Sequence, residues 1–88
     1  MLRLRIQEVA VQKGMSMMKL SHRSEVSYSL IRELFADPYH TITTHTLERI
    51  ADALGITALS LIEDVSDEYA RTERAALPAR QSQNKNPE

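Results

Sequence analysis

The fold is decided by residues 15–35, which read MSMMKLSHRSEVSYSLIRELF. Ser16 is a natural N-cap, because its hydroxyl can accept a hydrogen bond from a free backbone N–H group in the first turn of a helix. Ser27 is placed to cap a second helix in the same way. The stretch therefore predicts two short helices, one from Ser16 to about Ser24 and one over about Tyr28–Ala36, joined by a tight polar turn.

The second of these helices has two contrasting faces. On a helical wheel, Ile31, Leu34 and Phe35 cluster on one side, which we expect to face the core. A short or polar outer face fits the DNA major groove, which is about 12 Å wide, and two short helices at this spacing form a unit that places a helix there. The pattern alone also fits an ordinary solvated face of a helical bundle. The outer face carries Ser29, Arg32, Glu33 and Ala36, with Tyr28 and Leu30 at its margins.

A helix is also expected before this pair, over about residues 3–13. Its apolar residues recur at helical spacing, and Gly14 stands where a residue with a left-handed backbone ends many helices. The residues that share the apolar face are Leu2, Ile6, Val9 and Ala10.

Two more helices are expected after the pair. Residues 40–44 form a β-branched polar connector, in which an extended backbone would have no partner strand. Thr43 or Thr44 caps a helix that ends at Gly55, and a short fifth helix runs over residues 57–62. The apolar stripe of the longer helix is Leu47, Ile50, Ala51 and Leu54.

The character of the sequence changes after Val65. Ser66-Asp67-Glu68 could start one more short helix to about residue 77, with acidic groups at its positive end. From Pro78 onward polar residues dominate, and we expect disorder. The fold class is thus an all-α, compact five-helix bundle with a flexible C-terminal tail, divided into a domain of residues 1–65 and a tail of residues 66–88.

Size and composition argue against an enzyme or a metal protein. A chain of 88 residues forms one small core with little room for a deep active-site cleft. Cysteine is absent, which excludes disulfides and thiolate metal sites and fits a cytoplasmic protein. The sequence contains no catalytic motif, phosphate-binding glycine loop or apolar run that would span a membrane. We therefore expect no catalytic residues and no cofactor. We also expect no metal site, since His22, His40 and His45 lack clustered ligands around them.

Charge is distributed unevenly along the chain. The formal net charge is −1, but residues 1–24 carry five Lys or Arg residues against one Glu. Residues 63–88 carry six acidic residues against four basic ones. This asymmetry is compatible with one face that meets phosphate groups, and equally with charges that only solvate helix faces.

From Ile6 to Ile62 the chain resembles the phage-repressor and Cro type of helix-turn-helix domain, the xenobiotic-response-element family. The most specific part lies within residues 47–62, where LERIADALGI is close to the wording of the family. The resemblance implies a lambda-repressor-like fold and binding to double-stranded DNA. Further matching residues are Gly14-Met15-Ser16, Leu20, Val26-Ser27, Ile31 and Leu61-Ile62.

The chain departs from the family pattern at several positions. Met17 stands where the family has a phosphate-binding glutamine, and Glu25 replaces the turn glycine. If the backbone there is left-handed, a residue other than glycine costs about 1 kcal/mol. The other departures are Ser21 for alanine, Phe35 for glutamate and Asp37 for glycine.

The resemblance also implies which residues touch DNA. The N-terminus of the helix near Thr43 would present free N–H groups suited to a phosphate. Base contacts would come from Tyr28, Ser29, Arg32 and Glu33. Contacts to the DNA backbone would come from Ser16, Met17, Lys19, Ser27, His40, Thr43 and Thr44.

The expected function is sequence-specific transcription regulation, by a homodimeric repressor on a palindromic operator. One small module makes few base contacts, and a dimer doubles them over two half-sites. Leu59, Ile62 and Tyr69 are the candidate dimer surface, although Leu59 also fits an isolated exposed leucine. The alternative function is an antitoxin-like or adaptor module that binds a protein partner through the C-terminal segment. No membrane partner is expected.

Overall fold

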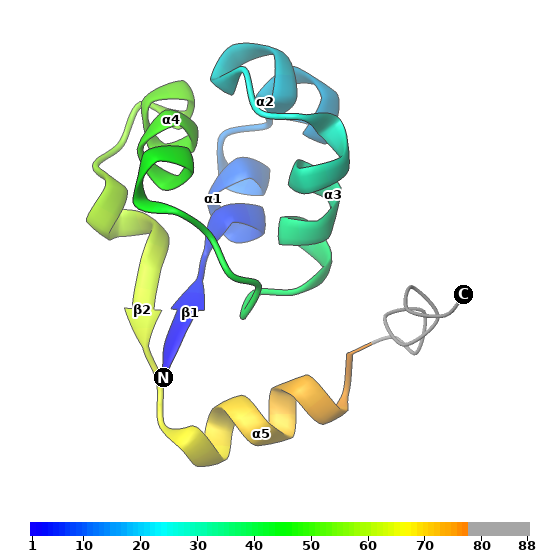
Figure 1. Cartoon of the computed structure of the whole chain (residues 1–88), viewed down its shortest axis with the longest axis vertical. Helices are drawn as coiled ribbons and strands as arrows, with labels where there is room; N and C mark the ends of the chain where they lie inside the picture. The colour runs from blue at the N-terminus through cyan, green and yellow to red at the C-terminus, as the bar shows by residue number, and fades with distance from the viewer. Residues whose placement is uncertain (78–88) are drawn as a thin grey trace.

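The computed structural model describes residues 1–77, and this part of the chain contains five α-helices, one short 3-10 helix and two β-strands (Figure 1). The protein is mainly helical, as predicted, and the small sheet is an addition to that prediction. In chain order the elements are β1 (Leu2–Leu4), α1 (Ile6–Gln12), α2 (Met17–Ser24), α3 (Tyr28–Ala36), α4 (Thr44–Leu54), η1 (Ala58–Leu61), β2 (Ile62–Asp64) and α5 (Asp67–Ala75).

The two helices expected in residues 15–35 are α2 and α3, and both begin at the predicted caps. The Ser16 hydroxyl accepts a hydrogen bond from the Lys19 N–H group at 3.1 Å. The Ser27 hydroxyl accepts one from the Leu30 N–H group at 3.2 Å. Each cap satisfies a backbone donor that the helix itself leaves free, which stabilises the helix start by about 1 kcal/mol.

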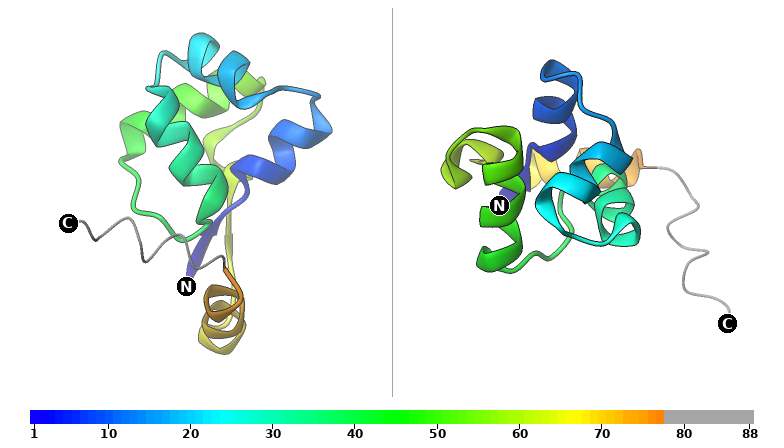
Figure 2. Two further views of the ribbon diagram at one scale, coloured as in Figure 1. Left: turned by 90° about the vertical axis from the view of Figure 1, so that its right-hand side faces the viewer. Right: turned by 90° about the horizontal axis from the view of Figure 1, so that it is seen from above.

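Helices α1 to α4 surround the core, and α5 lies at the end of the molecule opposite α2 (Figure 1, Figure 2). Helix α2 contacts both α3 and α4, while α1 contacts α3. Burying one large aliphatic side chain contributes about 1.5–3 kcal/mol. The largest fully buried side chains come from helices α1 to α4 and from η1: Ile6, Leu20, Ile31, Leu34, Ile50 and Leu61.

Strands β1 and β2 pair antiparallel, so the segment before α1 lies beside the segment that follows η1. Leu2 lies opposite Asp64, and Leu4 lies opposite Ile62. The predictions that the first helix starts near residue 3 and that the fifth helix reaches Ile62 were therefore wrong. Strands of three residues are stable only when they pair and pack on other elements, and this pairing joins residues at opposite ends of the chain.

A strand signal was present at the start of the chain. Leucines and arginines alternate over residues 2–5, which is the period of a strand with one buried face. Leu4 is buried against the core, but Leu2, predicted to lie on the apolar face of a helix, is 62% exposed. The helical spacing of Ile6, Val9 and Ala10 is real, and all three are buried in α1.

The C-terminal elements differ from the expected ones in kind. The short fifth helix expected over residues 57–62 is the 3-10 helix η1 followed directly by β2. Helix α5 begins at the cap predicted for one further helix, where the Ser66 hydroxyl accepts a hydrogen bond from the Tyr69 N–H group at 3.0 Å. The disorder expected from Pro78 onward lies outside the described residues. Over residues 1–77 the helices are too short or too polar to span a membrane.

Candidate nucleic-acid interface

The turn between α2 and α3 is built from serine hydroxyls. The Ser21 hydroxyl donates a hydrogen bond to the Val26 carbonyl oxygen at 2.6 Å. The buried Ser24 hydroxyl donates to the Leu20 carbonyl oxygen at 2.6 Å and accepts from the Val26 N–H group at 3.3 Å. These contacts satisfy backbone groups at the point where the chain changes direction. They hold α3 at a defined angle to α2.

Glu25 occupies the left-handed backbone conformation in this turn, with φ of 60°. The expectation for this position is thus met, and Glu25 takes a conformation that costs about 1 kcal/mol for a residue other than glycine. Its carboxylate makes an ion pair with the Arg49 guanidinium at 2.5 Å, and the same guanidinium donates to the Ser24 carbonyl oxygen at 3.1 Å. Arg49 therefore ties α4 to the turn. This role could not be predicted from local sequence patterns, because the partners are 24 or 25 residues apart.

The outer face of α3 is exposed, as predicted. Tyr28, Ser29, Arg32 and Glu33 all lie on the exposed side of the helix. Ile31 and Leu34 are buried on the opposite side. The structure thus places the four proposed base-contact residues on one accessible surface; their contacts with DNA stay a prediction.

Glu33 and His40, which were assigned to different kinds of DNA contact, face each other. His40 Nε2 lies 3.2 Å from Glu33 Oε1, and His40 Nδ1 lies 2.7 Å from the Thr41 carbonyl oxygen. The imidazolium form of His40 would neutralise the Glu33 carboxylate, which otherwise repels phosphate groups. The pair also joins α3 to the connector that leads into α4.

The residues proposed to contact the DNA backbone lie near three helix N-termini. Ser16 and Ser27 accept the N-cap hydrogen bonds of α2 and α3, and each hydroxyl still has a proton to donate to a phosphate. Thr43 caps α4 by accepting from the Thr46 N–H group at 3.1 Å, while its own hydroxyl donates to the Thr46 hydroxyl. Lys19 and Thr44 are exposed, and these contacts also stay predictions.

Met17 differs from its neighbours because it is half-buried and packs against the core. It lines a shallow hollow on the surface together with Arg32 and Phe35. The side chain at the start of α2 therefore borders the same hollow as a proposed base reader. Met17 offers no charged or hydrogen-bonding group beyond its backbone N–H, so any phosphate contact here would come from the backbone.

The three residues proposed for a dimer surface lie on three different elements. Leu59 on η1 is 78% exposed and Tyr69 on α5 is 52% exposed. Ile62 on β2 is half-buried and packs against the core. Within residues 1–77 no group of three or more His, Asp or Glu side chains is placed to hold a metal ion.

Comparison with known families agrees with this geometry. The model of the Cro/C1-type HTH DNA-binding domain matches residues 5–67, which is most of the chain. The protein therefore belongs to the Cro/C1-type helix-turn-helix family, a family of DNA-binding domains and not of enzymes. Searches of the curated proteins and of the solved structures found no match.

Proposed function

We propose that this protein regulates transcription by binding a specific double-stranded DNA sequence through the outer face of α3. The observation that carries this proposal is the state of Arg32. Its guanidinium is exposed on that face and has no hydrogen bond or ion pair within residues 1–77. Because no contact within the protein has to be broken first, this guanidinium is available to make two hydrogen bonds to a guanine edge.

The neighbouring residues support readout by the same helix. Ser29 is short enough to let the helix approach the base pairs and can donate to a base or a phosphate. Tyr28, at the start of α3, can pack its ring edge on a thymine methyl group. The backbone N–H groups and hydroxyls at Ser16 and Ser27 would position α3 by binding phosphates without reading sequence.

We further propose that the protein acts as a homodimeric repressor in the cytoplasm, on a palindromic operator that it occludes. Two copies double the number of base contacts, which a module of this size needs for useful specificity. Leu59 and Tyr69 are two of the large apolar residues that are exposed within residues 1–77, and they could form such a contact. A protein partner for residues 66–88, as in an antitoxin-like or adaptor protein, stays a prediction.

Selection of bound oligonucleotides from a random pool tests this function. The full chain should enrich one sequence with two inverted half-sites about one helical turn apart. Enrichment of a single half-site would support DNA reading and contradict the dimer. No enrichment, together with no binding at low salt, would contradict the proposed function as a whole.

A further inference from the structure

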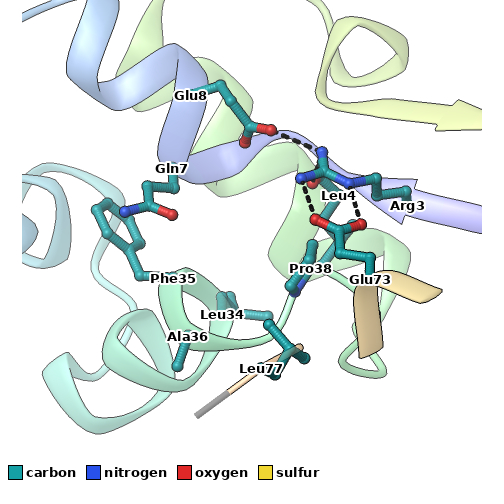
Figure 3. A pocket seen from close by; sticks show the side chains of 10 residues that line it. All are labelled: Arg3, Leu4, Gln7, Glu8, Leu34, Phe35, Ala36, Pro38, Glu73 and Leu77. Carbon is teal, nitrogen blue, oxygen red and sulfur yellow. Dashed lines mark hydrogen bonds and ion pairs between the residues drawn. The ribbon is translucent and has the colours of Figure 1, made fainter. Parts of the chain in front are cut away.

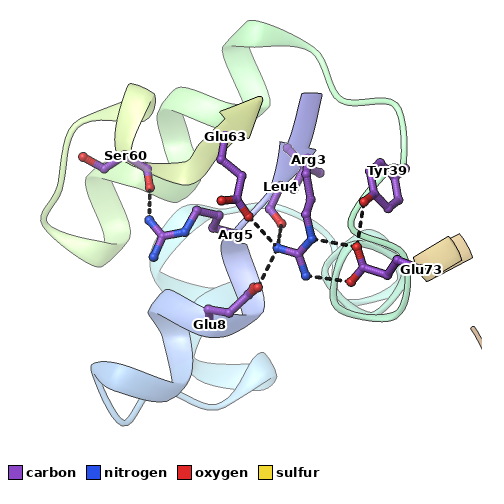
Figure 4. Close-up of polar contacts among 8 residues, drawn as sticks. All are labelled: Arg3, Leu4, Arg5, Glu8, Tyr39, Ser60, Glu63 and Glu73. Atoms are coloured by element: carbon purple, nitrogen blue, oxygen red, sulfur yellow. Dashed lines mark hydrogen bonds and ion pairs between the residues drawn. The ribbon is translucent and has the colours of Figure 1, made fainter. Parts of the chain in front are cut away.

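Arg3 is the centre of a cluster of charged groups at the end of the molecule that holds α5 (Figure 4). Its side chain is only 11% exposed and forms two parallel hydrogen bonds, both 2.9 Å long, with the two carboxylate oxygens of Glu73. Its Nη1 atom also contacts Glu8 at 2.6 Å and Glu63 at 3.1 Å. A bidentate pair of this kind is geometrically specific, so it fixes the position of Glu73 relative to β1.

Glu73 is also bonded to the connector between α3 and α4. The Tyr39 hydroxyl donates to Glu73 Oε1 at 2.6 Å (Figure 4). Burial, with the Glu73 carboxylate adding to it, raises the pKa of Tyr39 to about 12. The Arg74 guanidinium lies 5.7 Å from the centre of the Tyr39 ring, which is within range of a cation–π contact. Tyr39 is thus held by two successive residues of α5.

Apolar packing contributes little to the position of α5. Ala70 is the buried residue of this helix, and Leu77 beyond its end is half-buried. A cavity of about 100 Å³ remains between Leu77 and the side chains of α1 and α3, with Arg3 and Glu73 on its wall (Figure 3). Because α5 does not fill the space beneath it, directional polar contacts through Glu73 contribute to where the helix lies, together with the ion pair between the Met1 ammonium group and Asp67 at 3.7 Å.

The whole segment between α3 and α4, residues 37–43, is attached to the rest of the molecule at three successive residues. The Pro38 carbonyl oxygen accepts from the Leu4 N–H group of β1 at 2.7 Å. Tyr39 binds Glu73 of α5, and His40 faces Glu33 on α3. The next few residues lead directly to the N-cap of α4, so a shift at Tyr39 would move the surface proposed to contact phosphate.

We propose that Glu73 is a positioning residue for DNA binding, which acts through Tyr39 on residues 40–44. Arg3 and Glu73 both lie outside residues 5–67, the part of the chain that matches the family model. The inference rests on the proposed function. It makes α5 a part of the DNA-binding unit, in addition to any role of the C-terminal segment in binding a partner.

The test compares Tyr39→Phe with Glu63→Gln in the full chain. Tyr39→Phe keeps the ring and removes the hydrogen bond to Glu73. Glu63→Gln is the matched control, because it removes the charge of another partner of Arg3, one that does not touch Tyr39. Affinity is measured for the oligonucleotide selected by the wild-type protein, over a range of salt concentrations, and thermal unfolding is measured beside it.

Tyr39→Phe should weaken binding by about three- to tenfold, which is the effect of one hydrogen bond. The salt slope, that is, the slope of log affinity against log salt concentration, should become less steep by the amount expected for about one lost phosphate contact. The control should bind within about twofold of the wild type at a similar Tm. A substitution that only destabilised the protein would lower Tm and leave the salt slope unchanged. Glu73→Gln, whose amide oxygen can still accept from Tyr39, should bind better than Glu73→Ala.

A second measurement does not need DNA. In the free protein, the backbone amide chemical shifts of Thr41, Thr43 and Thr44 should change in Tyr39→Phe and stay unchanged in Glu63→Gln. Unchanged shifts and wild-type affinity in Tyr39→Phe would overturn the role of Glu73 and leave the proposed function intact. If the wild type bound no DNA at all, the proposed function would fail first and the role of Glu73 with it.

Discussion

Arg3 and Arg32 carry the same guanidinium group in opposite surroundings. Arg3 is nearly buried and bonded to three carboxylates at the α5 end of the molecule. Arg32 is exposed on α3 and has no such partner within residues 1–77. Burying a cation requires that all its donors be satisfied, whereas a cation that meets a ligand must be left unsatisfied until the ligand arrives. Arg3 therefore has a structural role, whereas Arg32 is available to bind a ligand.

Contacts within the protein also reduce the number of basic residues in the N-terminal part that could bind DNA. Five basic residues precede residue 25, and their number alone is compatible with a phosphate-facing surface. Arg3 is used up in the ion-pair cluster, and Arg5 donates to the Ser60 carbonyl oxygen at 3.0 Å. Only Lys13, Lys19 and Arg23 of this set have neither kind of contact within residues 1–77. The basic excess of the N-terminal part therefore overstates the charge available to DNA.

The largest expected effect on stability comes from Arg3→Ala. The substitution leaves Glu8, Glu63 and Glu73 close together without their common cation. Because removing one partner of a buried ion pair leaves uncompensated charge, the free energy of unfolding should fall by about 3 kcal/mol. Urea unfolding at neutral pH measures this. Arg5→Ala, which removes one hydrogen bond to a carbonyl, is the control and should cost about 1 kcal/mol. Equal losses in the two variants would contradict the claim that the ion pairs of Arg3 stabilise the fold more than a single hydrogen bond does.

A smaller change in the free energy of unfolding is expected when the pH is lowered. The hydrogen bonds from Arg3 lower the pKa of Glu73, and the one from Tyr39 lowers it further against the opposing effect of burial. Since the folded-state pKa lies below the unfolded value, this contribution to stability is complete above the unfolded pKa and is lost as the pH falls through the folded pKa. Arg3 also pairs with Glu8 and Glu63, which remain in the variant used for comparison.

Urea unfolding of the wild type and of Glu73→Gln, at neutral pH and at acid pH, measures this contribution. The wild type should be more stable by about 1–2 kcal/mol at neutral pH, and the difference should shrink towards zero in acid. A difference that stayed constant with pH would mean that the Glu73 charge does not stabilise the fold.

At the other end of the pH scale, the hydroxyl of Tyr39 should ionise late. Its raised pKa of about 12 means that the folded state keeps the proton where the unfolded state has lost it. Stability should therefore fall as the pH rises from the ordinary tyrosine pKa towards that value. Tyrosinate absorbance during an alkaline titration should contain a late component that Tyr39→Phe removes. The absence of any such component would contradict the partly buried hydrogen bond to Glu73.

The smallest effect is expected in the turn between α2 and α3. Glu25→Gly removes a backbone cost of about 1 kcal/mol and an ion pair with Arg49, which is worth little because the Glu25 side chain is 75% exposed. The net result should be a gain of about 0.5 kcal/mol. Glu25→Ala loses the ion pair and keeps the backbone cost, so it should be less stable than both. Equal stability of the glycine and alanine variants would exclude backbone strain at this position.

Local features of the fold could be predicted from the sequence, and long-range ones could not. The caps at Ser16 and Ser27 depend on residues within one helical turn, so the sequence shows them directly. The pairing of β1 with β2 and the bond from Arg3 to Glu73 join residues about 60 to 70 positions apart. The alternation over residues 2–5 indicates a strand, but it does not show which segment pairs with that strand, and a single charge does not show its partner.

The site divides in the same way. The exposed face of α3 follows from helical periodicity, and its assignment to base reading came from the resemblance to the family. The contacts of Tyr39, Arg49 and Glu73 depend on the tertiary structure, and the contact between Glu33 and His40 shows two predicted residues acting as a pair. The disorder expected after Pro78 lies outside the described residues.

The most direct test of the account is the affinity of Arg32→Ala for the selected operator and for random DNA of the same length and at the same salt. We predict a loss of about 1–3 kcal/mol on the operator and almost none on random DNA, because Arg32 reads a base. Lys19→Ala, at a proposed phosphate contact, should weaken both by similar amounts. An equal loss on both DNAs for Arg32→Ala, or an unchanged affinity for the operator, would contradict the claim that α3 reads sequence through this residue.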